Sequence, residues 1–199
     1  MAVNLTEEQI AIRDTFARFT DEQIIPNAEA IDEAHEYPRE TVKQLAELGF
    51  VGMRYPEADG GSDVDLTTFC LCVEEIARGS MSVAGCISMQ SLMGTKFLQM
   101  LGNDDIKERL FQPAMAAEKI GAICMTEPNA GSDLGGLATS ATKTEGGWVL
   151  NGNKIWVTAA PIADFFTVFA RAGDEKQLTT FLVEKDFKGI SVGKTIEKM

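Results

Sequence analysis

The first 118 residues repeat apolar side chains at the spacing of a helix face. Ile10, Phe16 and Phe19 form one such stripe, and Thr6, three residues before Gln9, has the form of a helix-capping box. A proline and a glycine bracket a second apolar stripe, which is typical of the two ends of a helix. The ranges that we expect to be helical are 6–26, 38–48, 66–78, 82–101 and 105–117, with a turn-rich loop over 56–63.

After Glu118 the apolar positions alternate, as they do in strands. The dipeptide Asn151-Gly152 is a strong hairpin signal, because both central positions of a type I′ turn need a positive φ. A run of helices followed by hairpin-linked strands predicts an α+β protein and not a Rossmann fold. We expect an all-α helical domain over 1–118 and an antiparallel β-barrel or sandwich domain over 119–199. The expected strands are 120–126, 137–144, 148–150, 154–158, 165–171, 179–184 and 191–197.

The composition of the 199 residues is that of an ordinary globular protein, with 45% hydrophobic and 24% charged residues. No apolar run approaches the roughly 20 residues that span a bilayer, and the first eight residues lack the features of a signal peptide. We therefore expect a soluble, cytoplasmic protein without a membrane partner.

The charge of the chain is unevenly placed. The net charge is -12, and it arises within residues 1–118, where Asp and Glu outnumber Lys and Arg, while residues 119–199 are balanced. An acidic chain without a basic cluster repels phosphate backbones, so we do not expect a nucleic-acid partner. The four cysteines Cys70, Cys72, Cys86 and Cys124 lie in apolar stretches, which favours buried reduced thiols over disulfides or a metal site.

The segment 124–136, Cys-Met-Thr-Glu-Pro-Asn-Ala-Gly-Ser-Asp-Leu-Gly-Gly, follows a predicted strand directly. Asn129 and Gly131 tolerate a positive φ, so the segment can curl and point several backbone NH groups at an anion. Ser132 and Thr126 add hydroxyl donors. On composition alone, a surface loop of turn residues explains this segment at least as well.

The segment Trp156-Val157-Thr158 carries an aromatic ring and a hydroxyl two residues apart, which share a face in a strand. A flat heterocycle could stack on the indole and accept a hydrogen bond from the threonine. A tryptophan in a strand is more often a packing residue, so this segment alone does not define a site.

Taken together, these segments resemble the FAD-dependent acyl-CoA dehydrogenase family, whose signature is usually Thr-Glu-Pro-x-Ala-Gly-Ser-Asp. The resemblance covers essentially all 199 residues, and several ordered motifs recur by chance far less often than one glycine-rich loop. The further motifs are Pro56-Glu57 before Gly60-Gly61, Glu74-Glu75-Ile76-Ala77-Arg78, Glu118-Lys119-Ile120-Gly121-Ala122, and Leu150-Asn151-Gly152-x-Lys154-Ile155-Trp156-Val157-Thr158.

The resemblance implies a three-domain enzyme of which this chain is the helical and middle β portion, without the C-terminal four-helix domain. It implies α,β-dehydrogenation of acyl-CoA thioesters in fatty acid metabolism, with electrons passed to an electron-transferring flavoprotein, and a homodimer or homotetramer. The family's catalytic base is a glutamate of the C-terminal domain, so we expect no catalytic residue in this chain.

Carried over position by position, the resemblance gives two sets of binding residues. Thr126 would bond the pyrimidine side of the flavin, Trp156 would cover the ring, and Thr158 would reach N5. The family commonly has an asparagine after this threonine, whereas Ala159 follows here. The full set expected to contact FAD is Ile123, Cys124, Met125, Thr126, Gly131, Ser132, Trp156, Val157 and Thr158, and the set expected to contact the acyl-CoA is Ser132, Met89 and Met93.

Two other functions fit the same residues. A relative that reduces an enoyl-CoA, or that uses oxygen as acceptor, would need the same flavin contacts. A short, non-catalytic module that binds flavin or a partner is the third hypothesis. One helical stripe is formed by Met89, Met93, Phe97 and Met100. Such a stripe usually belongs to a protein core, but it would also suit the lining of an acyl cavity.

Overall fold

The computed structural model describes residues 4–196. The chain divides between Glu118 and Lys119 into two compact units, a helical unit and a β unit, which we describe separately. Within residues 4–196, no helix combines the length and the apolar character that crossing a bilayer requires.

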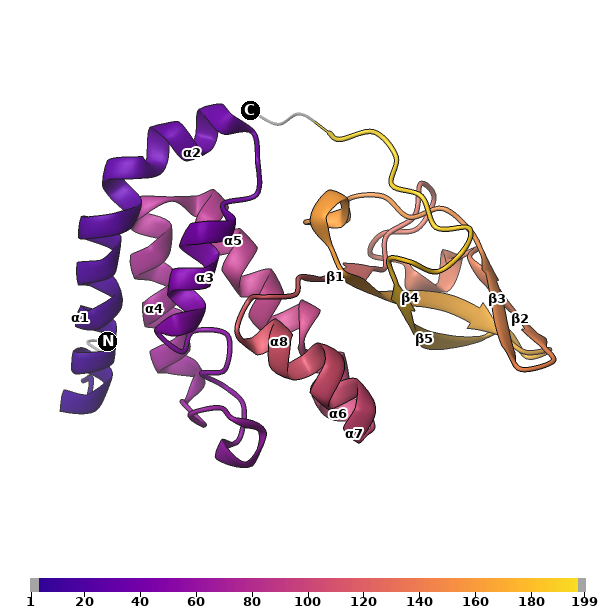
Figure 1. Cartoon of the computed structure of the whole chain (residues 1–199), viewed down its shortest axis with the longest axis horizontal. Helices are drawn as coiled ribbons and strands as arrows, with labels where there is room; N and C mark the ends of the chain where they lie inside the picture. Colours follow the sequence, from indigo (N-terminus) through magenta and orange to yellow (C-terminus); the bar gives the residue numbers. More distant parts are fainter. Residues whose placement is uncertain (1–3, 197–199) are drawn as a thin grey trace. The chain divides into compact units, whose positions relative to one another are not determined.

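The helical unit contains the expected helices and one more (Figure 1). Between Ile25 and Arg39, where we expected no helix, a short helix forms and ends at His35 in a left-handed conformation. Its sequence lacks an apolar stripe, which explains why it was not predicted, and Asn27 at its start makes no side-chain capping hydrogen bond. The α-helices are α1 (Glu7–Phe19), α2 (Ala28–Ala34), α3 (Arg39–Glu47), α4 (Leu66–Gly79), α5 (Met81–Met89), α6 (Lys96–Leu101), α7 (Asp104–Ile106) and α8 (Gln112–Met115).

The starts of the helices follow from side-chain caps. Thr6 accepts a hydrogen bond from the amide of Gln9, and the Gln9 side chain accepts one from the Thr6 amide, which confirms the predicted capping box of α1. At the start of α4, Asp65 accepts hydrogen bonds from the amides of Thr67 and Thr68.

Three of the expected helices are interrupted by π-helical turns: Thr20–Ile24 after α1, Gln90–Gly94 between α5 and α6, and Lys107–Phe111 between α7 and α8. Polar contacts hold the middle one, because the Tyr55 hydroxyl lies 2.6 Å from the carbonyl oxygen of Ser91, and Gln90 donates to the carbonyl of Ala114. A π turn adds a residue to the helix and so shifts the face that later side chains present.

The core of the helical unit forms around Phe50, which is fully buried. Its ring packs edge-on against Phe16 at 5.6 Å between centroids and in a tilted arrangement against Phe69 at 5.2 Å. These rings come from α1, α4 and the loop after α3, so one aromatic cluster joins three parts of the unit.

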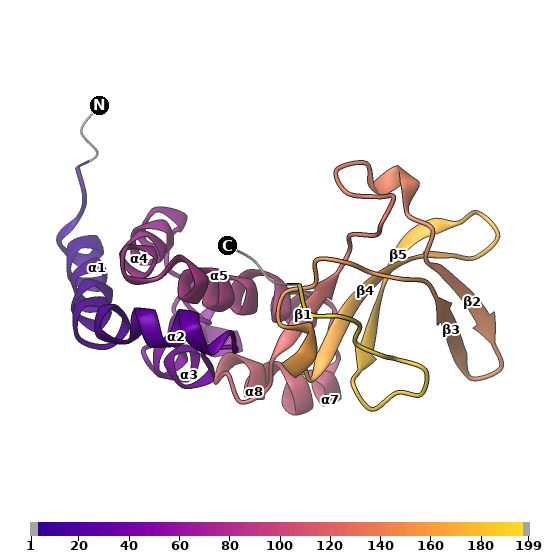
Figure 2. The ribbon, with the colours of Figure 1, turned by 90° about the horizontal axis from the view of Figure 1, so that it is seen from above.

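The β unit is a single five-stranded sheet in which β4 is central (Figure 2). β4 pairs in parallel with β1 along its first half and with β2 near its end, and it pairs antiparallel with β5. β2 and β3 form an antiparallel hairpin. The strands are β1 (Gly121–Cys124), β2 (Ser140–Thr144), β3 (Gly147–Asn151), β4 (Phe165–Ala172) and β5 (Gln177–Glu184).

The prediction of an α+β protein is correct, but the prediction of an antiparallel barrel or sandwich is wrong. The sheet is mixed and open, with two parallel pairings on one side of β4. Hairpin signals in a sequence predict only antiparallel neighbours joined by short turns, whereas parallel pairs need long connections that carry no local signature.

The predicted strand over 154–158 is also wrong. β3 ends at Asn151, and neither Asn151 nor Gly152 has the positive φ of a type I′ turn. A Cβ on Gly152 would clash with the side chain of Thr139, so this glycine serves close packing and not a hairpin. Likewise, residues 191–196 form no strand, and Glu197 lies outside the described residues.

Candidate functional site

Two connections of the β unit lie side by side. One is the loop from Met125 to Thr139, between β1 and β2, and the other is the segment 152–163, between β3 and β4. The amide of Ile155 donates a hydrogen bond of 2.9 Å to the carbonyl oxygen of Thr126. This bond brings Thr126 next to Trp156, although the strand expected to carry Trp156 does not form.

Glu127 is the centre of this arrangement and is buried, with 6% of its surface exposed. Its carboxylate accepts hydrogen bonds from the amides of Ala138 (2.7 Å) and Thr139 (3.0 Å) and from the hydroxyl of Thr139. These bonds close the loop, because they tie Glu127 near its start to Ala138 and Thr139 at its end.

Lys154 joins the other segment to the same carboxylate. Its ammonium group lies 2.8 Å from Oε1 of Glu127 and 3.2 Å from the carbonyl oxygen of Met125, and the two charged side chains are 10% and 6% exposed. Burial raises the pKa of Glu127, but the hydrogen bonds from Lys154, Thr139 and Ala138 outweigh that effect and lower the pKa to about 2. Glu127 is therefore ionised and fully occupied by structural contacts.

Arg171 of β4 holds the far part of the loop. Its guanidinium group donates to the carbonyl oxygens of Leu134 (3.3 Å), Gly135 (2.6 Å) and Leu137 (3.4 Å). The loop is thus fixed at its start by Glu127 and near its end by Arg171.

The middle of the loop leaves hydrogen-bond donors open. Glu127 and Ala130 exchange backbone hydrogen bonds across a tight turn, and the exposed residues 131–133 follow this turn. Within the described part of the chain, the amides of Gly131, Ser132 and Asp133 and the hydroxyl of Ser132 bond no protein acceptor. An exposed row of free amides and a hydroxyl suits an anionic group such as a phosphate.

Trp156 combines two unfavourable features. Its φ is +58°, a left-handed conformation that is rare for a bulky residue, and 60% of its surface is exposed. Val157 next to it packs against the cluster of Ala122, Cys124, Ala163 and Phe166, which anchors the segment in the β unit. An exposed aromatic ring on a strained backbone indicates a ligand-contact position.

The remaining predicted residues lie around these two segments. Ile123 is half-buried in β1, and burial raises the pKa of the Cys124 thiol to about 11, with a smaller opposing effect of Lys154. The hydroxyls of Thr126 and Thr158 make no hydrogen bond among the described residues, so both remain available as donors to a ligand.

Met89 and Met93 lie in the helical unit, and the structure does not place them relative to the loop. Met89 is half-buried, Met93 is 39% exposed and Met100 is 61% exposed, so their stripe is not the core of that unit. We expected buried cysteines, but Cys70 is exposed.

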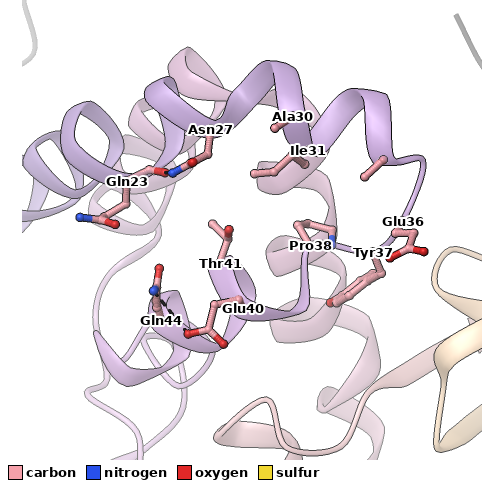
Figure 3. A pocket seen from close by; sticks show the side chains of 11 residues that line it. Gln23, Asn27, Ala30, Ile31, Glu36, Tyr37, Pro38, Glu40, Thr41 and Gln44 are labelled. Carbon is pink, nitrogen blue, oxygen red and sulfur yellow. Dashed lines mark hydrogen bonds between the residues drawn. The ribbon is translucent and has the colours of Figure 1, made fainter.

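A cavity of about 400 Å³ lies elsewhere, in the helical unit between α2 and α3 (Figure 3). Tyr37, Glu40 and Gln44 are among its lining residues, and none of the predicted flavin-binding or substrate-binding residues reaches it. It is therefore not the site predicted from the sequence. No group of three or more metal-ligating side chains occurs within residues 4–196.

The described geometry suits a planar ligand that has polar edges and a phosphate tail. The indole of Trp156 offers a flat apolar surface, the free hydroxyls of Thr126 and Thr158 flank the junction of the two segments, and the amides of 131–133 lie beyond the turn. FAD has this combination of parts, so the residues present fit the cofactor that the sequence suggested.

Comparison with known protein families shows to which family the chain belongs. The family description "Acyl-CoA dehydrogenase, N-terminal domain" matches residues 6–119, and "Acyl-CoA dehydrogenase, middle domain" matches residues 122–199. The chain belongs to the acyl-CoA dehydrogenase family. The boundary between the two family domains coincides within a few residues with the division between the helical and β units.

Two curated relatives of the family are similar along the whole chain. Benzylmalonyl-CoA dehydrogenase from Aromatoleum aromaticum is 66% identical over 100% of this chain and 53% of its own length. The 3-(aryl)acrylate reductase of Clostridium sporogenes is 40% identical over 98% of this chain and 52% of its own length. The chain therefore spans about half the length of the curated relatives it matches.

Solved structures agree in fold. An acyl-CoA dehydrogenase from Bacillus anthracis complexed with FAD gives a TM-score of 0.87 at 30% identity, covering 98% of this chain and 34% of its own. A structure described as the electron transferring flavoprotein of Acidaminococcus fermentans gives a TM-score of 0.90 at 31% identity. The match covers 100% of this chain and 53% of that chain.

Sequence reasoning missed two residues that build the site. Lys154 lies two positions before Trp156 in a motif of the family, yet its charge gave no sign that it would be buried. Arg171 stands in an apolar strand with no local signal, and its contacts with 134–137 depend on the parallel pairing of β2 and β4.

Proposed function

We propose that this chain is the FAD-binding helical and middle portion of an enzyme that introduces an α,β double bond into an acyl-CoA thioester. The observation that carries this proposal is the adjacency of the Thr126 loop and the Trp156–Thr158 segment, in a chain whose two units match two consecutive family domains. When bound, FAD accepts the hydride that leaves the β carbon of the substrate.

The chain's own residues would hold the flavin in three ways. Thr126 donates its free hydroxyl to the polar edge of the ring, Trp156 covers a face of the ring, and the hydroxyl of Thr158 bonds the ring near N5. Donors at that position favour the charge that develops there during reduction. Ser132 and the neighbouring free amides bond the pyrophosphate, with Ile123, Cys124, Met125, Gly131 and Val157 completing the contacts.

We propose that Glu127 is not the catalytic base. Glu127 follows Thr126 in the loop, but its oxygens already accept four hydrogen bonds and its pKa is about 2. A carboxylate of so low a pKa is a weak base for removing an α proton. By resemblance to the family, the base would be a glutamate of the C-terminal domain.

We propose that the acyl group carries an aromatic substituent. Both curated relatives described above are named for aryl-bearing substrates, benzylmalonyl-CoA and an arylacrylate. The half-buried Met89 and the exposed Met93 offer thioether sulfurs, which pack well against aromatic rings. Ser132 is a further proposed contact of the bound acyl-CoA.

The further partners rest on the resemblance and remain proposals. An electron-transferring flavoprotein would reoxidise the flavin, and the enzyme would assemble as a homodimer or homotetramer. A cytoplasmic location and a place in fatty acid metabolism are likewise inferred from the sequence alone.

A second candidate is the reverse reaction, reduction of an aryl-substituted enoyl thioester. The 40% identity with an arylacrylate reductase favours it, because the same flavin contacts serve either direction.

The test uses the protein expressed from its complete gene. We expect purified protein to contain about one FAD per chain, to bleach near 450 nm under anaerobic 3-phenylpropanoyl-CoA, and to bleach less with butyryl-CoA. The reductase would be supported if the saturated thioester leaves the oxidised flavin unbleached, while cinnamoyl-CoA reoxidises chemically reduced flavin and restores its visible absorbance. Bound FAD that responds to neither thioester would contradict both reactions.

A further inference from the structure

The buried ion pair between Glu127 and Lys154 joins the two segments of the candidate site. Glu127 belongs to the loop that carries Thr126 and Ser132, and Lys154 belongs to the segment that carries Trp156 and Thr158. Glu127 and Lys154 are 27 residues apart in sequence, and the pair connects the two segments through side chains that are 6% and 10% exposed.

We propose that Lys154 and Glu127 are positioning residues that couple the two flavin-binding segments. This inference rests on the proposed function, because it assigns the pair the task of fixing where Thr126 and Thr158 stand relative to each other.

The contacts of Lys154 support a positioning role more than a simple charge balance. Besides Glu127, the ammonium group bonds the carbonyl oxygen of Met125, the residue before Thr126. The next amide along the chain after Lys154, that of Ile155, bonds the carbonyl oxygen of Thr126 itself. Three successive loop residues are therefore held by two successive residues of the other segment.

The carboxylate of Glu127 completes the coupling on the other side of the loop. It accepts bonds from the amides of Ala138 and Thr139, so a displacement of Lys154 is transmitted to both ends of the loop. Since a misplacement of about 1 Å can change a reaction rate by about a hundredfold, such a linkage matters for groups that contact the flavin ring.

Three variants of the full-length protein separate positioning from stability. Lys154→Met leaves a buried carboxylate without its cation, and Glu127→Gln leaves a buried cation without its anion. The double variant Glu127→Gln/Lys154→Met removes both charges, so it regains folding stability over the single variants, yet it lacks the link between the segments. Lys185→Met is the control, since Lys185 pairs with Asp164 at 2.7 Å in the same unit with 53% of its side chain exposed.

Two readouts decide the proposal. In Lys154→Met and in the double variant we expect the visible absorption bands of FAD to shift and its affinity to fall about tenfold or more, because the flavin contacts lose their spacing. By hydrogen exchange without flavin, we expect the amides of Ile155 and Thr139 both to exchange about tenfold faster or more. The control should resemble the unmodified protein in both measurements.

A double variant with regained stability and an unshifted flavin spectrum would overturn the proposal, because the pair would then serve stability alone. Faster exchange at Thr139 with no change at Ile155 would also overturn it. If the unmodified protein binds no FAD, the proposed function fails, and the exchange of these two amides still decides whether the segments are coupled.

Discussion

At the scale of single residues, the segment after β3 has two non-glycine residues in the left-handed region. Trp156 has a φ of +58° and Ala159 has a φ of +63°, and each such residue costs roughly 1–2 kcal/mol relative to a right-handed conformation. The position at which the sequence departs from the family pattern, Ala159, thus adopts the conformation that asparagine tolerates best. The departure changes the residue without removing the turn.

We predict that Ala159→Asn stabilises the protein by about 0.5–1 kcal/mol, because asparagine enters the left-handed region more readily than alanine. Urea unfolding of the two proteins measures the difference. Ala160→Asn is the matched control, since Ala160 begins a 3-10 turn and has no positive φ, and it should give no gain. Equal effects at both positions would contradict this explanation.

Glu127 gives a prediction about pH. Its pKa is about 2 in the folded protein and 4.5 as its ordinary value, so its contribution to stability is complete above about pH 4.5 and is lost as the pH falls toward 2. Glu127→Gln should lower stability at pH 7 by about 3 kcal/mol, since it leaves Lys154 without its buried partner.

The pH dependence of the Glu127→Gln variant supplies the check. Its free energy of unfolding should fall less between pH 4.5 and pH 3 than that of the unmodified protein, because the titrating group is gone. Parallel curves for the two proteins would show that Glu127 does not carry the stabilisation.

At the scale of elements, close packing explains where the helices meet. Gly79, the last residue of α4, lies against the π-helical turn after α1, and a Cβ there would stand 2.6 Å from Cγ2 of Thr20 and 2.9 Å from Cγ2 of Ile24. Gly85 of α5 has no atom within 4 Å of such a Cβ.

These two glycines should respond to alanine with opposite signs. Gly79→Ala should destabilise the protein by about 1–3 kcal/mol through overpacking. Gly85→Ala should stabilise it by about 0.5–1 kcal/mol, because alanine is the better helix former in open space. Thermal unfolding of the two variants provides the measurement, and a loss of stability in both would show that the interface at Gly79 is not the cause.

The positions of helices and strands could be predicted where they depend on residues that are close together in the sequence. The capping box at Thr6 and the apolar stripes predicted the long helices, and the expected strands 137–144 and 148–150 correspond to β2 and β3, joined by a turn at Gly146, whose φ is +88°. The Asn151-Gly152 dipeptide led to a wrong hairpin prediction. Gly152 is required because Thr139, a residue distant in sequence, approaches it closely. Local patterns do not report such contacts.

At the scale of the whole molecule, the order of the strands could not be predicted, because β4 pairs in parallel with both β1 and β2 through long connections. The sequence pointed to the two segments that lie side by side, but it did not predict how they are joined. Thr126 and Trp156 do come together, yet through an irregular segment that Lys154 and Glu127 hold, and not through a strand.

The most direct test of the proposed flavin site compares the two tryptophans of the chain in the full-length protein. Trp156 stands in the proposed site, whereas Trp148 of β3 is 41% exposed and packs against Phe181. We predict that Trp156→Ala lowers the affinity for FAD about tenfold, in line with an aromatic stacking contribution of about 1.5 kcal/mol, and that Trp148→Ala leaves it unchanged. Equal FAD affinity in Trp156→Ala and the unmodified protein would contradict the placement of the flavin against this segment.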